Sequence, residues 1–208
     1  GHLYLPAHPM ADFFQELFIF HKPVYASMYF PGTALFYVPS IWLHIPNWLW
    51  SALVSGAAVA MTYRVLAEAL DGASGVLGAM LLVACGTFRL TSIMVMSHPL
   101  TLLFGLLMCW SYLNWRVHRR MRWIVCFGTF AGWAAITRPI DAIAWCLPPL
   151  ICIVTGLWRR PRREMFTALL IMGAAAAPFL ALQFIFDKGV TGKWLETPVQ
   201  AYHHKNFP

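Results

Sequence analysis

Arg89 and Arg138 each lie within or at the end of an apolar stretch of this 208-residue chain. A planar guanidinium can hold a phosphate group through two parallel hydrogen bonds. A cation within an apolar membrane segment costs roughly 2.5–3.5 kcal/mol unless it faces protein or water. Arg89 and Arg138 are therefore candidates for binding an anionic group. Either can instead be an interfacial side chain that snorkels to lipid headgroups, and Arg138 has an alternative partner in Asp141, three positions on.

The first segment of the chain carries a second group of polar candidates. Lys22 precedes Tyr25 and Tyr29, and a point charge beside aromatic rings can bind a lipid phosphate or a sugar. The alternative is a solvated loop lysine. Asp12 and Glu16 are the carboxylates of this segment. Either can act as a general base, although isolated loop carboxylates are usually surface charges.

Further candidates lie at a helix boundary and near the C-terminal end. His98 precedes Pro99 and can donate to a phosphate or cap a helix. The last segment mixes cations, rings and small polar residues: Thr191, Gly192, Lys193, Trp194, Tyr202, His203 and His204. Two adjacent imidazoles without an acidic partner are a weak ligand set, so we assign no metal site and no cofactor.

The composition indicates a multi-pass membrane protein. Hydrophobic residues make up 60% of the chain and charged residues 11%, which is more apolar surface than a soluble fold of this size can bury. The net charge of +7 does not indicate nucleic-acid binding, because four basic residues lie in each of two clusters between apolar runs, at 116–122 and 159–163. The five cysteines fall within apolar segments and are interpreted as small core residues.

The elements that must position these residues are predicted to be membrane-spanning helices. Runs near the ~20 residues needed to cross the hydrocarbon give about six spans, at 48–70, 74–96, 99–117, 121–138, 140–158 and 165–186. They lack the alternation of barrel strands, so the predicted class is all-α, a multi-pass helical bundle. Residues 1–47 are expected to form an outer loop with a juxtamembrane helix over 31–43, residues 48–187 the bundle, and residues 188–208 the start of an outer loop.

The arginine clusters predict the orientation. Cytoplasmic connections between membrane helices collect Lys and Arg, so both clusters are expected inside the cell. Counting spans outward then places 97–99, 137–141 and the two end segments on the outer side of the cytoplasmic membrane. Most candidate polar residues are thus expected on one face.

Short motifs along the chain carry a resemblance to a known superfamily. They are Gly1 to Met10, Pro23 to Gly32, Arg89-Leu90, Thr137-Arg138-Pro139, Val190-Thr191-Gly192, Pro198 and Tyr202. Their order resembles the GT-C superfamily of polytopic membrane glycosyltransferases, in the branch of dolichyl-phosphate-mannose protein mannosyltransferases and aminoarabinose transferases.

The resemblance implies an inverting transfer of a sugar from a polyprenyl phosphate to a protein, lipid or glycan acceptor. The membrane lipid, the donor and the acceptor would be the partners. The donor phosphate would be bound by Arg138, Arg89, Lys22 and His98. The substrate loops would contain Tyr25, Tyr29, Gly32, Thr191, Gly192, Lys193 and Tyr202.

Two departures from the superfamily pattern affect this expectation. Phe30 replaces the first proline of a Pro-Pro-Gly element. The acidic Asp-Glu catalytic element would lie upstream of Gly1, so the general base is expected there, with Asp12 or Glu16 as the fallback. We therefore expect these 208 residues to be an internal piece of the enzyme that is inactive alone.

Two other functions fit a helical membrane protein. A transporter or permease needs polar residues near the middle of the bilayer and often a repeated half. Only Arg89 approaches that depth, and no internal repeat is visible in the sequence. A non-catalytic membrane subunit is the other alternative. The outward concentration of polar residues favours the glycosyltransferase.

Overall fold

The computed structural model describes residues 4–7, 10, 18–21, 24–158 and 161–206. Over these residues the chain forms nine helices and three short strands. It divides into two compact units. The first, here called the helical unit, is Gly32–Pro178; the second, the terminal unit, combines Gly1–Pro31 with Phe179–Pro208. The predicted helical class is confirmed for most of the chain, and the strands were not predicted.

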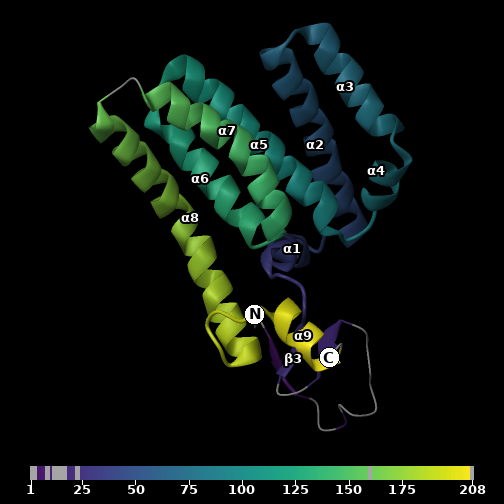
Figure 1. Cartoon of the computed structure of the whole chain (residues 1–208). Helices are drawn as coiled ribbons and strands as arrows, with labels where there is room; N and C mark the ends of the chain where they lie inside the picture. The colour runs from purple at the N-terminus through teal and green to yellow at the C-terminus, as the bar shows by residue number, and fades with distance from the viewer. Residues whose placement is uncertain (1–3, 8–9, 11–17, 22–23, 159–160, 207–208) are drawn as a thin grey trace. The chain divides into compact units, whose positions relative to one another are not determined.

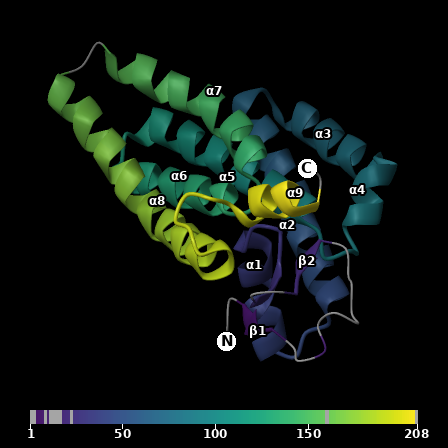
Figure 2. The ribbon, with the colours of Figure 1, turned by 60° about the horizontal axis from the view of Figure 1, so that its bottom comes forward.

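The helical unit is built around a central helix. Its elements are α1 (Gly32–Trp42), α2 (Asn47–Ala69), α3 (Gly72–Ala84), α4 (Gly86–Thr91), α5 (Ser97–His118), α6 (Met121–Ala135), α7 (Pro139–Trp158) and the first part of α8 (Arg162–Thr191). Helix α5 packs against α2, α6 and α7, while α3 packs along α2. Both views show α5, α6 and α7 side by side (Figure 1; Figure 2).

The core of this unit surrounds the first half of α5, where buried residues lie on every side of the helix. Leu100, Phe104 and Met108 are buried at intervals of four residues, which places them on the same side of a helix. The Phe104 ring lies 5.7 Å from the ring of Trp133 on α6 and 5.8 Å from that of Phe36 on α1. This aromatic contact brings α1, α5 and α6 together near the start of α1.

Three of the described helices are long and apolar enough to cross a membrane: α2, α7 and α8. The chain therefore has the character of a membrane protein. Six such helices are not seen: α5, although 22 residues long, is not among the three, and the apolar run over 74–96 is divided. Cys85 has an extended backbone (φ −65°, ψ 115°) that separates α3 from α4, and a glycine follows it. The predicted span over 121–138 is shorter than expected, since α6 ends at Ala135.

The terminal unit contains a small antiparallel sheet. Its strands are β1 (Leu5–Pro6), β2 (Ile19–Phe20) and β3 (Val24–Ser27), with β3 in the middle. The end of α8 and helix α9 (Pro198–Asn206) complete the unit. Strands of two to four residues carry no periodic sequence signal of their own, which is why the apolar pattern did not predict them.

A separate core holds this unit together. Phe20 and Ala26 from the sheet pack with Phe186 and Val190 from the end of α8. At Gly189 the ring of Tyr4 approaches so closely that a Cβ atom would overlap it. The N-terminal strands are thus packed on the last turns of α8, in a pairing of chain segments that lie far apart in the sequence.

Candidate functional site

The first candidate site, in the helical unit, is a junction between the start of α1 and the turn that joins α6 to α7. The Gly32 amide donates to the Ile136 carbonyl at 2.8 Å, and the Trp133 indole Nε1 donates to the Gly32 carbonyl at 3.1 Å. A Cβ atom on Gly32 would lie 2.6 Å from the Ile136 oxygen and nearer still to Thr137 Oγ1. Only glycine fits this close approach. The predicted helix over 31–43 is present as α1, and its first residue meets the α6–α7 turn.

The turn is fixed by its own hydrogen bonds. The amides of Thr137 and Arg138 both donate to the Ala134 carbonyl, at 3.0 and 2.8 Å. The buried Thr137 hydroxyl donates to the Trp133 carbonyl at 2.8 Å. Pro139 then begins α7, a position where proline is favoured because the missing N–H would have no partner in the helix. The backbone that carries Arg138 is therefore held rigidly.

The Arg138 side chain pairs with Asp141, as one of the sequence interpretations expected. Its Nε lies 2.6 Å from Asp141 Oδ2, and the two side chains are 34% and 39% exposed. Pairs this exposed stabilise a protein by only about 0–1 kcal/mol. A guanidinium has five N–H donors, and the contact with Asp141 uses one. Arg138 can thus bind an additional anion at the surface, beside the N-terminal end of α7, where negative charge is favoured.

Two other predicted phosphate ligands lie on different elements. Arg89 is exposed in the last turn of α4, and His98 is exposed at the start of α5. Among the described residues, neither side chain is joined to Arg138 by a hydrogen bond or ion pair. The remaining predicted candidates Lys22, Asp12 and Glu16 lie outside the described residues.

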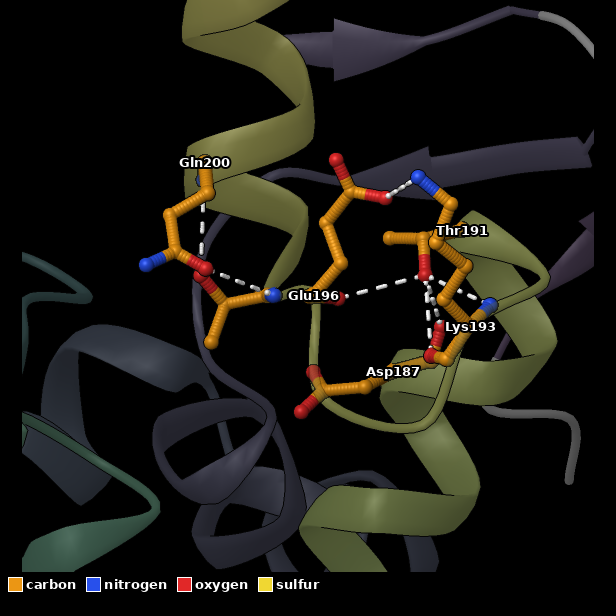
Figure 3. Close-up of polar contacts among 6 residues, drawn as sticks. Asp187, Thr191, Lys193, Glu196 and Gln200 are labelled. Atoms are coloured by element: carbon orange, nitrogen blue, oxygen red, sulfur yellow. Dashed lines mark hydrogen bonds and ion pairs between the residues drawn. The ribbon is translucent and has the colours of Figure 1, made fainter.

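In the terminal unit, Thr191 organises the loop between α8 and α9 (Figure 3). Its hydroxyl donates to the Asp187 carbonyl at 2.8 Å and lies 3.1 and 3.2 Å from the carbonyls of Lys193 and Glu196. The Lys193 amide donates to the same hydroxyl oxygen at 3.1 Å. Gly192 follows with a positive φ of 79°, a conformation that favours glycine. The predicted substrate loop is therefore a folded turn rather than an open chain.

The charged side chains of this loop have partners within it. Lys193 Nζ lies 2.9 Å from Glu196 Oε2, and Lys188 Nζ lies 4.7 Å from the centre of the Trp194 ring. Figure 3 also shows the reciprocal cap at the start of α9, where the Thr197 amide donates to Gln200 Oε1 and the Gln200 amide donates to Thr197 Oγ1. These contacts fix the direction in which α9 leaves the loop.

The predicted tyrosines lie in the terminal unit, two of them in or just after β3 and the third on α9. Tyr202, on α9, packs edge-on against Phe20 with ring centres 5.7 Å apart, and its hydroxyl accepts from the Phe18 amide at 3.2 Å. Tyr29 is exposed after β3, and its ring lies 5.8 Å from that of Phe18. Tyr25 pairs with Leu5 across the sheet. The two segments that supply the predicted tyrosines, far apart in the sequence, therefore meet here.

One conspicuous polar pair was missed from the sequence. Asp187 is 3% exposed, and its Oδ1 accepts from Gln183 Nε2 at 2.7 Å. Gln183 Oε1 is also buried and has no hydrogen-bond partner in the part of the chain that the structure describes. Asp187 directly follows the apolar run over 165–186. At that position the sequence pattern indicates only the end of a span and gives no sign that the carboxylate is buried. A buried carboxylate is a candidate proton acceptor.

Comparisons with known proteins identified no relative of this chain. No known protein family, no characterised protein and no solved structure matches the chain. The residues themselves therefore carry the functional argument.

Proposed function

We propose that the chain is part of a GT-C-type membrane glycosyltransferase, which moves a sugar from a polyprenyl-phosphate donor to a protein, lipid or glycan acceptor with inversion. The observation that carries this proposal is the junction at Gly32. Two motifs on which the resemblance rests, Pro31-Gly32 and Thr137-Arg138-Pro139, come from distant parts of the chain. They meet in one close-packed turn that presents Arg138.

The chemistry of the proposed reaction gives Arg138 a defined role. The acceptor oxygen forms a bond to the anomeric carbon while the bond from that carbon to the phosphate oxygen breaks. The leaving group is an anionic lipid phosphate, which is best stabilised by donors fixed before the reaction. Arg138 is a permanent cation on a rigid turn beside the N-terminal end of α7, and both features favour a phosphate there.

A carboxylate must accept the proton that the acceptor hydroxyl loses. The resemblance expects this base upstream of Gly1. The fallback candidates, Asp12 and Glu16, lie outside the described residues. Either carboxylate could take the proton directly.

The proposal includes a six-span arrangement in the cytoplasmic membrane. The segments α3 with α4, α5 and α6 would cross together with α2, α7 and α8. The clusters at 116–122 and 159–163 would lie in the cytosol. At 1.5 Å per residue the 15 residues of α6 cover about 22 Å, less than the ~30 Å of hydrocarbon. If α6 starts at the inner boundary, the turn that carries Arg138 would lie a few ångströms below the outer headgroup boundary, and the long arginine side chain could extend from there to a lipid phosphate.

The test is a transfer assay on the intact protein in membranes, with labelled polyprenyl-phosphate sugars. Arg138→Ala should lower transfer by about 100-fold or more, as expected when one fixed donor to a developing anion is lost. Arg138→Lys should recover only part of the rate, because an ammonium cannot make the paired contact. Arg64→Ala is the matched control, since Arg64 also pairs with a neighbouring carboxylate, Glu68, at 2.7 Å.

Two results would contradict the proposal. Normal transfer in Arg138→Ala would remove Arg138 from the site. If no labelled product forms with any polyprenyl-phosphate sugar while the protein carries a solute across the vesicle membrane, the chain belongs to a transporter instead. Cysteine labelling at position 138 from the cytosolic side alone would overturn the orientation.

A further inference from the structure

An aromatic cluster in the terminal unit stands partly in solvent. Phe18 and Tyr29 are 44% and 55% exposed, and the centres of their rings lie 5.8 Å apart. Tyr202 is half-buried on α9, and the centre of its ring lies 6.3 Å from that of Phe18. We call Phe18, Tyr29 and Tyr202 the aromatic platform.

The backbone of Phe18 is held in an unfavourable conformation. Its φ is +67°, in the left-handed region that bulky residues rarely adopt. The Phe18 amide donates to the Tyr202 hydroxyl at 3.2 Å, and the Phe18 carbonyl accepts from the Met28 amide at 3.0 Å. Strain of this kind persists where surrounding contacts impose it, and it concentrates at functional sites. The strained backbone here keeps a phenyl ring beside Tyr29 at the surface.

The surroundings of the platform differ from the exposed apolar surface of α3. On α3, neighbouring large apolar side chains are exposed together, such as Leu77, Met80 and Leu81. In the platform, by contrast, Tyr29 and Tyr202 carry hydroxyl groups, and the exposed Ser27 lies beside Tyr29, whose amide donates to the Ser27 hydroxyl oxygen at 3.1 Å. The platform is thus an apolar surface of ring size with polar neighbours, which is unlike a continuous contact with lipid tails.

We infer that the aromatic platform binds the pyranose ring of a saccharide. A pyranose has an apolar C–H face and a rim of hydroxyl groups, so it matches an aromatic surface with polar neighbours, as in many small-molecule sites. This inference rests on the proposed glycosyl transfer and adds a binding site for a sugar ring. The sugar belongs either to the lipid-linked donor or to a glycan acceptor.

The decisive variant is Phe18→Gly in the intact protein. Glycine adopts a positive φ without strain, so the backbone and its two hydrogen bonds should be kept while the ring is lost. Soluble oligosaccharides and, separately, a short-chain polyprenyl-phosphate sugar are titrated by isothermal calorimetry in micelles. Phe18→Gly should lower the affinity for the sugar ligand by about tenfold, which is the scale of one aromatic contact. Its melting temperature should be unchanged or higher. Tyr29→Ala should weaken the same ligand.

Trp42→Ala is the control, because Trp42 is another exposed aromatic residue and lies at the end of α1, in the helical unit. It should leave sugar affinity unchanged. Weaker binding of the soluble oligosaccharide alone would identify the acceptor as the source of the sugar, and weaker binding of the lipid-linked sugar alone would identify the donor. Unchanged affinity for both in folded Phe18→Gly and Tyr29→Ala would overturn the inference. The inference would also be overturned if Phe18→Gly and Tyr29→Ala changed only the partition of the protein into phosphatidylcholine vesicles.

The two proposals can fail separately. Sugar binding that depends on Phe18 in a protein without transfer activity would overturn the proposed function and keep the platform. Transfer activity with sugar binding that does not depend on Phe18 would do the reverse.

Discussion

Gly32→Ala tests the junction that presents Arg138. The new Cβ atom would lie 2.6 and 2.7 Å from the oxygen and carbon of the Ile136 carbonyl, where ordinary contacts begin at 3.4 Å. These are backbone atoms, so the α6–α7 turn must move by several tenths of an ångström or more. Overpacking of this kind costs roughly 1–3 kcal/mol, and weakening the Gly32–Ile136 hydrogen bond adds about 1 kcal/mol. We expect a loss of about 2–4 kcal/mol in the free energy of unfolding.

The measurement is an equilibrium unfolding titration with dodecyl sulfate in mixed micelles, followed by tryptophan fluorescence. Gly56→Ala is the matched control, because Gly56 lies within α2 and a Cβ atom there meets no other atom within 4 Å. It should be neutral or stabilising by up to about 1 kcal/mol, since alanine favours a helix over glycine. Transfer activity should fall in Gly32→Ala and not in Gly56→Ala. If Gly32→Ala unfolds at the same detergent fraction as the wild type, the close approach at Gly32 does not exist.

Two further predictions concern carboxylates. Asp187→Asn keeps an oxygen that can accept from Gln183, so the free energy of unfolding should change little, whereas Asp187→Ala removes the acceptor of the Gln183 amide and should lose about 1–3 kcal/mol; equal stability of the two variants in a denaturation titration would contradict this. Asp71 caps α3 by accepting from the Ser74 amide at 2.8 Å, and this backbone hydrogen bond lowers the Asp71 pKa below its ordinary value. Its stabilising effect should therefore be complete above the unfolded pKa of about 4 and disappear as pH falls through the lower folded pKa. As the pH is lowered from 5 to below 3, the wild type should lose free energy of unfolding relative to Asp71→Asn, which has no carboxyl group to titrate at this position. A difference between the two proteins that does not change with pH would contradict this.

Much of the helical unit could be predicted from local sequence. The predicted helix over 31–43 and the apolar runs at 48–70 and 140–158 agree with α1, α2 and α7 to within one residue at each end. They do so because the length of an apolar run, and the proline or charged residues that end it, act on neighbouring residues only. The division at Cys85 escaped prediction, because a single glycine and threonine after it are tolerated within an apolar helical run.

The candidate sites show where local patterns stop being informative. Gly32 and Arg138 were both named from the sequence, yet only the structure joins the Gly32 amide to the Ile136 carbonyl. Asp187 was passed over because its burial is decided by neighbours in space rather than in sequence. The left-handed backbone of Phe18 likewise depends on the Tyr202 hydroxyl, which lies 184 positions away.

The sequence by itself thus determined that the chain is helical, strongly apolar and marked by two arginine clusters, since each property is a sum over neighbouring residues. The tertiary structure alone decided which glycine meets which turn, which carboxylate is buried and which rings stand together. The physical reason is that close packing and hydrogen bonding act between atoms a few ångströms apart, however far apart their residues lie along the chain.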